Sequence, residues 1–139
     1  MYAEPLRILL VEDSSALAQL TSSMIQDVGH RIAGLAETVA DAIELARANR
    51  PDLAIVDIAL PDGCGLDLVQ YFRRDDIPCI IASAYLPTSS ETVMDGIPWL
   101  TKPFTERDLT AALEQAIGRL KRLKRFKRLA QPEFPDRCN

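Results

Sequence analysis

The chain of 139 residues is long enough for one domain with a single sizeable core, and its 47% hydrophobic and 26% charged residues exclude a disordered or fibrous protein. No apolar run exceeds five residues and the N-terminus has no basic region, so we expect a cytoplasmic protein with neither a membrane span nor a signal peptide. The net charge of -4 is uneven, because residues 1–118 hold 8 Lys and Arg against 18 Asp and Glu, whereas residues 119–139 hold 8 against 2.

Strand-like runs alternate with helix-like segments from the start of the chain. The run RILLV, residues 7–11, is followed by apolar residues at helical spacing, and Gly29 is expected to end that helix. Residues 30–36 are predicted to form the second strand. Thr38 with Asp41 has the pattern of a capping box and predicts the start of a helix that Pro51 terminates.

The second half of the chain continues this alternation. The remaining strands are expected at residues 53–56, 79–82 and 99–100. A Pro-Asp-Gly loop leads from the first of these into a helix over residues 65–72. The next helical patch, residues 91–94, has prolines on both sides, so this fourth helix is expected to be little more than a turn. Thr105 with Asp108 predicts the start of the last helix.

The strands are apolar throughout rather than alternating, which is typical of a parallel sheet covered on both faces by helices. Strand followed by helix, repeated five times, therefore predicts an α/β fold with a doubly wound, five-stranded parallel sheet. In such sheets, ligands lie outside the carboxyl ends of the strands at the point where the strand order reverses.

Polar residues follow the carboxyl ends of four predicted strands, namely Glu12 with Asp13, Asp57, Ser83 and Lys102. Each of them alone is compatible with an ordinary strand end or helix cap. Together, three carboxylates at one edge of a sheet repel one another unless a cation neutralises them. Oxygen ligands are those that Mg²⁺ prefers, so we expect a magnesium site at this edge.

The motifs LLVEDS, IVDIALPDG, SA at 83–84 and LTKPF at 100–104 resemble those of the receiver domain of two-component response regulators, over residues 6 to about 118. The resemblance implies the flavodoxin-like receiver fold and Mg²⁺-dependent phosphorylation of Asp57. The donor would be a sensor histidine kinase or a histidine phosphotransfer protein, and the signal would pass to a downstream protein target. We expect a single-domain regulator without a DNA-binding domain that catalyses only its own phosphorylation and dephosphorylation.

The same resemblance implies how the residues around Mg²⁺ divide their roles. Asp13 and Asp57 would bind the ion directly, together with the backbone carbonyl of Ala59. Glu12 would act through water. Lys102 would pair with the phosphoryl oxygens, where its charge stabilises the negative charge of the transition state.

Further roles implied by the resemblance concern the later strands. Ser83 would offer its hydroxyl to the phosphoryl group, and the small Ala84 would leave that group room to enter. Trp99 occupies the position of a switch aromatic that turns inward when Ser83 moves, although a plain core aromatic is the alternative. The bond before Pro103 would be cis, as is usual in the family.

The histidine and the cysteines have plainer interpretations. His30 begins a strand, and we interpret it as structural rather than as a phosphodonor. The cysteines form no CxxC pair, and we interpret all three as structural or incidental: Cys64, Cys79 and Cys138.

Three other functions use similar residues. A phosphate sink or relay intermediate without conformational output would need the same site. A Mg²⁺-dependent phosphohydrolase of the haloacid dehalogenase type needs a second Asp two residues after the nucleophile, where this chain has Ala59. A flavin or nucleotide binder would need a phosphate-binding loop after the first strand, where Glu12 and Asp13 would repel a phosphate.

We divide the chain into a receiver domain, residues 1–118, and a basic helical extension and tail, residues 119–139. Seven Lys and Arg between Arg119 and Arg128 surround the helix axis, and contact with the core is expected to end near Leu123. The extension is either a solvated helix that aids solubility or a cationic contact. In the second case its partner is an acidic protein or the chain's own acidic body, with nucleic acid as the weaker alternative.

Overall fold

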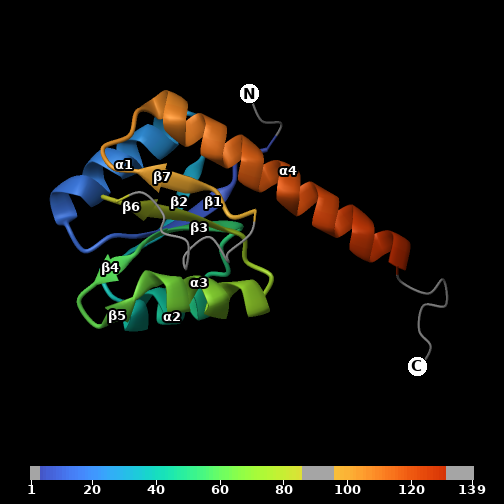
Figure 1. Cartoon of the computed structure of the whole chain (residues 1–139), viewed down its shortest axis with the longest axis horizontal. Helices are drawn as coiled ribbons and strands as arrows, with labels where there is room; N and C mark the ends of the chain where they lie inside the picture. The colour runs from blue at the N-terminus through green and yellow to red at the C-terminus, as the bar shows by residue number, and fades with distance from the viewer. Residues whose placement is uncertain (1–3, 86–95, 131–139) are drawn as a thin grey trace.

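The computed structural model describes residues 4–85 and 96–130, apart from the side chains of residues 120, 123, 124 and 126–130. A parallel five-stranded sheet runs through the middle of the molecule, with strand order β2-β1-β3-β6-β7 (Figure 1). Its strands are β1 (Arg7–Val11), β2 (Arg31–Ala36), β3 (Leu53–Asp57), β6 (Cys79–Ser83) and β7 (Trp99–Thr101). The expected doubly wound parallel sheet is therefore confirmed.

Four described helices cover the sheet in two layers. They are α1 (Ser15–Asp27), α2 (Val39–Ala48), α3 (Gly65–Arg74) and α4 (Glu106–Ala130). α2 and α3 lie on one face, and α1 with the first part of α4 lies on the other (Figure 1). The helical patch expected at residues 91–94 lies outside the described residues.

Alternate residues along the buried strands supply the two cores. In β3, Ala54 and Val56 face the α2 and α3 layer, whereas Leu53 and Ile55 face the α1 and α4 layer. Both faces of this strand are buried under helices, which explains why its sequence is a continuous apolar run. The polar residue that ends this strand, Asp57, is thereby carried to the edge of the sheet.

Helix caps follow the predictions made from local sequence. The Thr38 hydroxyl accepts a hydrogen bond from the Asp41 amide at 3.0 Å, which satisfies one exposed donor at the start of α2. Thr105 and Asp108 form the reciprocal capping box, with bonds of 3.1 and 3.0 Å. Gly29, just after α1, adopts φ +101°, a conformation that favours glycine.

The sheet order reverses beside β1. β2 pairs with β1 on one side and β3 pairs with it on the other, both in parallel. The carboxyl ends of β1 and β3 therefore meet at the point where such sheets bind their ligands. A small antiparallel hairpin that the sequence did not predict follows β3, formed by β4 (Ala59–Leu60) and β5 (Gly63–Cys64).

Candidate functional site

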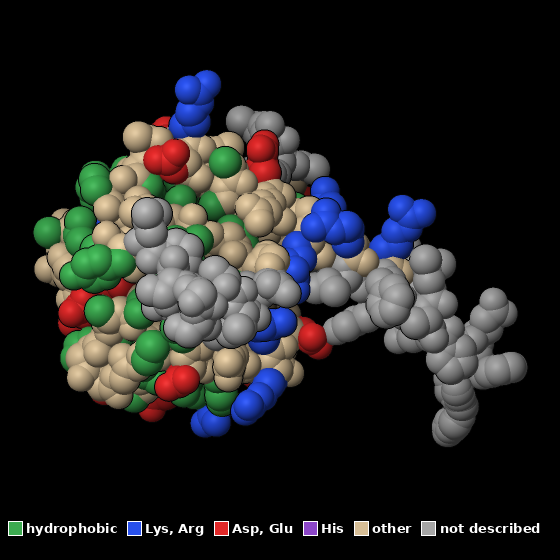
Figure 2. Space-filling model, viewed as in Figure 1, with side chains coloured by type: hydrophobic (Ala, Val, Ile, Leu, Met, Phe, Trp, Pro, Cys, Tyr) green, Lys and Arg blue, Asp and Glu red, His purple; other side chains and the backbone are tan. Residues whose placement is uncertain are grey.

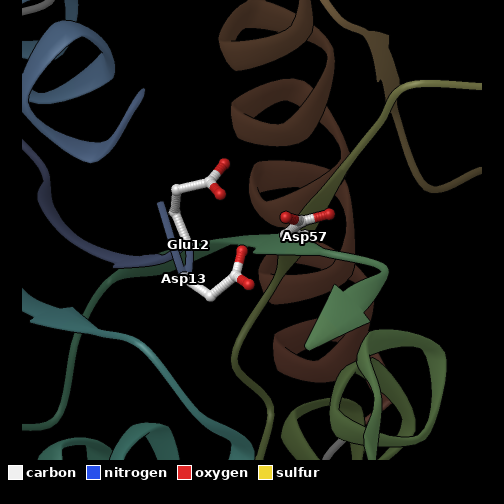
Figure 3. Close-up of side chains that lie close together, drawn as sticks. All are labelled: Glu12, Asp13 and Asp57. Atoms are coloured by element: carbon white, nitrogen blue, oxygen red, sulfur yellow. The ribbon is translucent and has the colours of Figure 1, made fainter. Parts of the chain in front are cut away.

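Three carboxylates gather at the end of β1 and β3. Glu12 and Asp13 follow β1, Asp57 ends β3, and one oxygen of each lies within 4.8 Å of the others. Figure 3 shows the three side chains in one space at the edge of the sheet. Glu12 and Asp57 are buried, with exposed fractions of 5% and 8%, whereas Asp13 is exposed to solvent. The cluster can therefore be reached from solvent on the Asp13 side.

Lys102 provides the positive charge of the site. Its ammonium lies 2.5 Å from Glu12 Oε1 and 3.1 Å from Asp57 Oδ2, so one cation bridges two buried carboxylates. The backbone positions it, because the Lys102 amide donates a hydrogen bond of 2.7 Å to the carbonyl of Ser83 on the neighbouring strand. The bond between Lys102 and Pro103 is cis.

The ionisation of this group reflects burial and pairing. Burial raises the pKa of Glu12, while hydrogen bonds from Lys102 and from the Ser14 amide oppose that shift. Burial alone would lower the pKa of Lys102, but its hydrogen bonds to Glu12 and Asp57 outweigh this effect and raise it. Lys102 is therefore firmly charged at neutral pH.

The turn after Asp57 is fixed by backbone contacts. The Ala59 amide donates to Asp57 Oδ1 at 3.2 Å, and the Gly65 amide donates to the Ile58 carbonyl at 2.7 Å. A Cβ atom on Gly65 would overlap the carbonyl oxygen of Asp57, so only glycine fits at this position. The sequence motif PDGCG contains this glycine, but nothing local indicates the close approach, which depends on how α3 packs on β3.

Ser83 and Trp99 are linked through one residue. The buried Ser83 hydroxyl accepts a hydrogen bond from the Tyr85 amide at 3.1 Å. The indole nitrogen of the half-buried Trp99 donates to the carbonyl of the same Tyr85 at 3.2 Å. Ala84 lies between Ser83 and Tyr85 and is exposed at the edge of the sheet. A movement of the segment after β6 would therefore reach both side chains.

The histidine and two of the cysteines, namely His30, Cys64 and Cys79, are not part of the carboxylate cluster. His30 is buried just before β2, and its Nδ1 accepts a hydrogen bond from the Leu6 amide at 2.9 Å. Cys64 is exposed at the start of α3, whereas Cys79 is buried and burial raises the pKa of its thiol to about 12. Neither the buried imidazole nor the buried thiol is placed for phosphoryl chemistry at the carboxylate cluster.

The donor set fits a hard divalent cation. It consists of carboxylate oxygens, one of them on an exposed residue, and Mg²⁺ binds such oxygens while keeping several waters. Soft ligands are not part of this group, since the nearest cysteine in sequence, Cys64, is outside it. The arrangement therefore suits magnesium.

A doubly wound parallel sheet with an acidic cluster and a lysine at its carboxyl edge defines the receiver class of signalling domain. Residues 8–114 match the family described as Response regulator receiver domain, so the chain belongs to this family. Its members receive a phosphoryl group on an aspartate and bind Mg²⁺ at an acidic site.

Relatives of known role are regulators. The chain is 30% identical over 125 residues to the transcriptional regulatory protein PdtaR of Mycobacterium tuberculosis, covering 87% of this chain and 61% of PdtaR. It is 32% identical over 133 residues to the acid tolerance regulatory protein ActR of Rhizobium meliloti, covering 92% and 64%. The chain thus spans about three fifths of the length of these relatives.

Solved receiver domains have the same fold. The domain of the PhyR response regulator from Erythrobacter litoralis matches 81% of this chain and 90% of its own, with a TM-score of 0.71 and 28% identity. The signal receiver domain of a putative Luxo repressor protein from Vibrio parahaemolyticus matches 93% and 100%, with a TM-score of 0.73 and 30% identity. Among the described helices, none has the length and hydropathy that crossing a membrane requires.

Proposed function

We propose that this chain accepts a phosphoryl group on Asp57 from a phosphohistidine donor, with Mg²⁺ bound at the carboxylate cluster, and signals by binding another protein. The observation that carries the proposal is the bridge from Lys102 to Asp57 at 3.1 Å and to Glu12 at 2.5 Å. A partly buried lysine held between two buried carboxylates is costly to desolvate. The positive charge of Lys102 would become useful when a phosphoryl group brings more negative charge to Asp57.

The proposed transfer is a direct displacement at phosphorus. A carboxylate oxygen of Asp57 forms a bond to phosphorus while the bond to the donor's imidazole nitrogen breaks, and that nitrogen keeps the bonding electrons. Bound Mg²⁺ would neutralise the charge that builds on the phosphoryl oxygens. Lys102 already donates a hydrogen bond to Asp57 Oδ2, so its charge lies beside the place where the phosphoryl oxygens would arrive and would act without having to reorganise.

Each residue at the edge has a role in this proposal. Asp13 and Asp57 would bind Mg²⁺ directly with the carbonyl of Ala59, and Glu12 would hold the ion through water. Ser83 would turn its hydroxyl toward the phosphoryl group, which costs it the hydrogen bond from the Tyr85 amide. Ala84 would leave the phosphoryl group room to enter because its side chain is a single methyl group.

The donor in this proposal is a sensor histidine kinase or a histidine phosphotransfer protein, as the family's chemistry requires. Output would begin with Ser83, because losing its bond to Tyr85 would loosen the residue that also holds Trp99. A phosphate sink would use the same transfer but leave this link unchanged. A phosphohydrolase has less support, since Ala59 offers no side-chain acid two residues after Asp57.

The proposed phosphorylation is tested with acetyl phosphate as the donor. Intact-protein mass spectrometry should find one added phosphoryl group in the native chain with Mg²⁺, and almost none with EDTA. The Asp57→Asn variant should gain none. Equal labelling of this variant would contradict the assignment of Asp57.

A second proposal concerns the C-terminal part of α4. The helix has 25 residues, and the last of its described side chains buried in the core is Ile117. Beyond that point it leaves the body, and Figure 1 shows it projecting into open space. Lys and Arg side chains, drawn in blue, gather where the helix projects from the body (Figure 2). We propose that residues 119–130 are a cationic contact for an acidic protein surface.

The contact is tested by comparing the full chain with a chain of residues 1–123. Binding to polyglutamate at low salt should be strong for the full chain, weak for the shorter one, and reduced by added salt. Equal binding by both would leave the helix as a solvated extension. Binding to duplex DNA but not to polyglutamate would contradict the acidic protein and favour nucleic acid.

A further inference from the structure

Asp62 makes a long-range contact that the proposed reaction does not yet use. It lies in the turn between β4 and β5, and its two carboxylate oxygens accept hydrogen bonds from the Val39 amide at 2.7 Å and the Ala40 amide at 3.1 Å. These two amides are the first donors of α2, which have no partner within the helix. The loop that follows Asp57 is thus tied to the start of a different helix.

α2 already has a cap of its own. Thr38 is the residue before the helix, and its hydroxyl accepts a hydrogen bond from the Asp41 amide at 3.0 Å. Asp62 and Thr38 therefore satisfy different amides of the same helix end. Of these two caps, Asp62 comes from the phosphoacceptor loop and Thr38 from the residue before the helix, so the two caps have separable consequences.

The hairpin that carries Asp62 is small and held at both ends. Its base is closed by the bond from the Gly65 amide to the Ile58 carbonyl, and its strands pair Leu60 with Gly63. Its tip is attached to the protein through Asp62. Ala59 lies between these two attachments, and its amide donates to Asp57 Oδ1 at 3.2 Å.

The charge state of Asp62 suits this contact. Hydrogen bonds from the Val39 and Ala40 amides lower its pKa although the side chain is exposed, so the carboxylate is charged at neutral pH. A carboxylate at a helix start also interacts favourably with the helix dipole. The contact between Asp62 and the start of α2 therefore combines hydrogen bonds with a favourable charge interaction.

We propose that Asp62 is a positioning residue for the phosphoacceptor site, because it fixes the hairpin against α2 and so holds Ala59 in place beside Asp57. The inference rests on the proposed function, in which the Ala59 carbonyl is a Mg²⁺ ligand. Without Asp62, the hydrogen bond at the base of the hairpin remains, but the hydrogen bonds that attach its tip to α2 are lost. The Ala59 carbonyl then samples several positions, and the ion loses part of its binding.

The experiment compares Asp62→Ala with Thr38→Ala in the full chain. Both remove a cap from α2, so both should lower the unfolding temperature. Mg²⁺ affinity, measured by calorimetry, should fall roughly ten-fold in Asp62→Ala, as is typical when a residue that orients a metal ligand is lost. In Thr38→Ala it should stay within two-fold of the native value, roughly the scatter expected for a site with no direct link to the ion.

A second measurement makes the test independent of the ion. Without Mg²⁺, amide hydrogen exchange in residues 58–65 should be faster in Asp62→Ala than in Thr38→Ala. Equal Mg²⁺ affinity and equal exchange in the two variants would overturn the inference and leave Asp62 as a helix cap only. If the native chain itself binds no Mg²⁺, the proposed function fails instead, and faster exchange would still report the loss of the tie.

Discussion

Lys102 Nζ lies 3.1 Å from Asp57 Oδ2, although 45 residues separate them in sequence, and the same ammonium contacts the buried Glu12. Replacing Lys102 with Met leaves two buried carboxylates without a counter-ion. In EDTA, the free energy of unfolding should fall by about 1–3 kcal/mol, the usual cost of leaving a buried polar group unsatisfied. Added Mg²⁺ should recover part of the loss. Urea unfolding in both buffers checks this, and unchanged stability in EDTA would contradict it.

Gly65 and Gly118 make a matched pair of glycine substitutions. A Cβ on Gly65 would overlap the carbonyl oxygen of Asp57, so Gly65→Ala should lower both the unfolding temperature and the rate of phosphorylation. Gly118 lies inside α4, where, among the described side chains, a Cβ would meet Arg122 alone, at an ordinary distance of 3.5 Å. Gly118→Ala should raise stability by about 0.5–1 kcal/mol, because glycine weakens helix interiors. Thermal unfolding of both variants gives the comparison, and similar shifts would refute the steric explanation.

His30 makes stability depend on pH. Burial lowers its pKa in the folded protein, so in the unfolded chain it takes up a proton more readily, near the ordinary value of 6.5. Stability from this source is fully present above that value and should decline as pH falls below it. Urea unfolding from pH 8 to pH 5 measures the decline. His30→Asn should lose part of this slope, and an identical slope in the variant would assign the pH dependence to other groups.

Trp99 should report the state of the site. It is the single tryptophan of the chain. Its indole nitrogen donates a hydrogen bond to the Tyr85 carbonyl, and the Tyr85 amide donates one to the Ser83 hydroxyl. Mg²⁺ with beryllofluoride, which mimics an acyl phosphate, should change the indole emission if Ser83 turns inward. The Ser83→Ala variant serves as the control and should respond less. An unaltered spectrum at saturation would favour a core aromatic and a site without conformational output.

Much of the fold follows from local sequence. Each strand of the main sheet lies within one residue of its predicted bounds, because a continuous apolar run between polar ends is a local signal. The cap of α2 by Thr38 is local as well. The acidic cluster could also be predicted, since parallel strands bring their carboxyl ends to one edge.

What the sequence does not predict depends on contacts between distant segments. The β4 and β5 hairpin is too short for a recognisable period. The role of Asp62 depends on the start of α2, which lies 22 and 23 residues earlier in the chain. The requirement for Gly65 depends on how closely α3 approaches β3. These are tertiary contacts, and no local pattern encodes them.

The most direct test of the central claim locates the modified residue itself. Borohydride reduces an aspartyl phosphate to homoserine, so the native chain, treated with acetyl phosphate and Mg²⁺ and then reduced, carries a permanent mark at the acceptor. Peptide sequencing by mass spectrometry should find homoserine at position 57, and the mark should be absent when Mg²⁺ is replaced by EDTA. Homoserine at position 13, or at no position, would contradict the assignment of Asp57 as the phosphoacceptor.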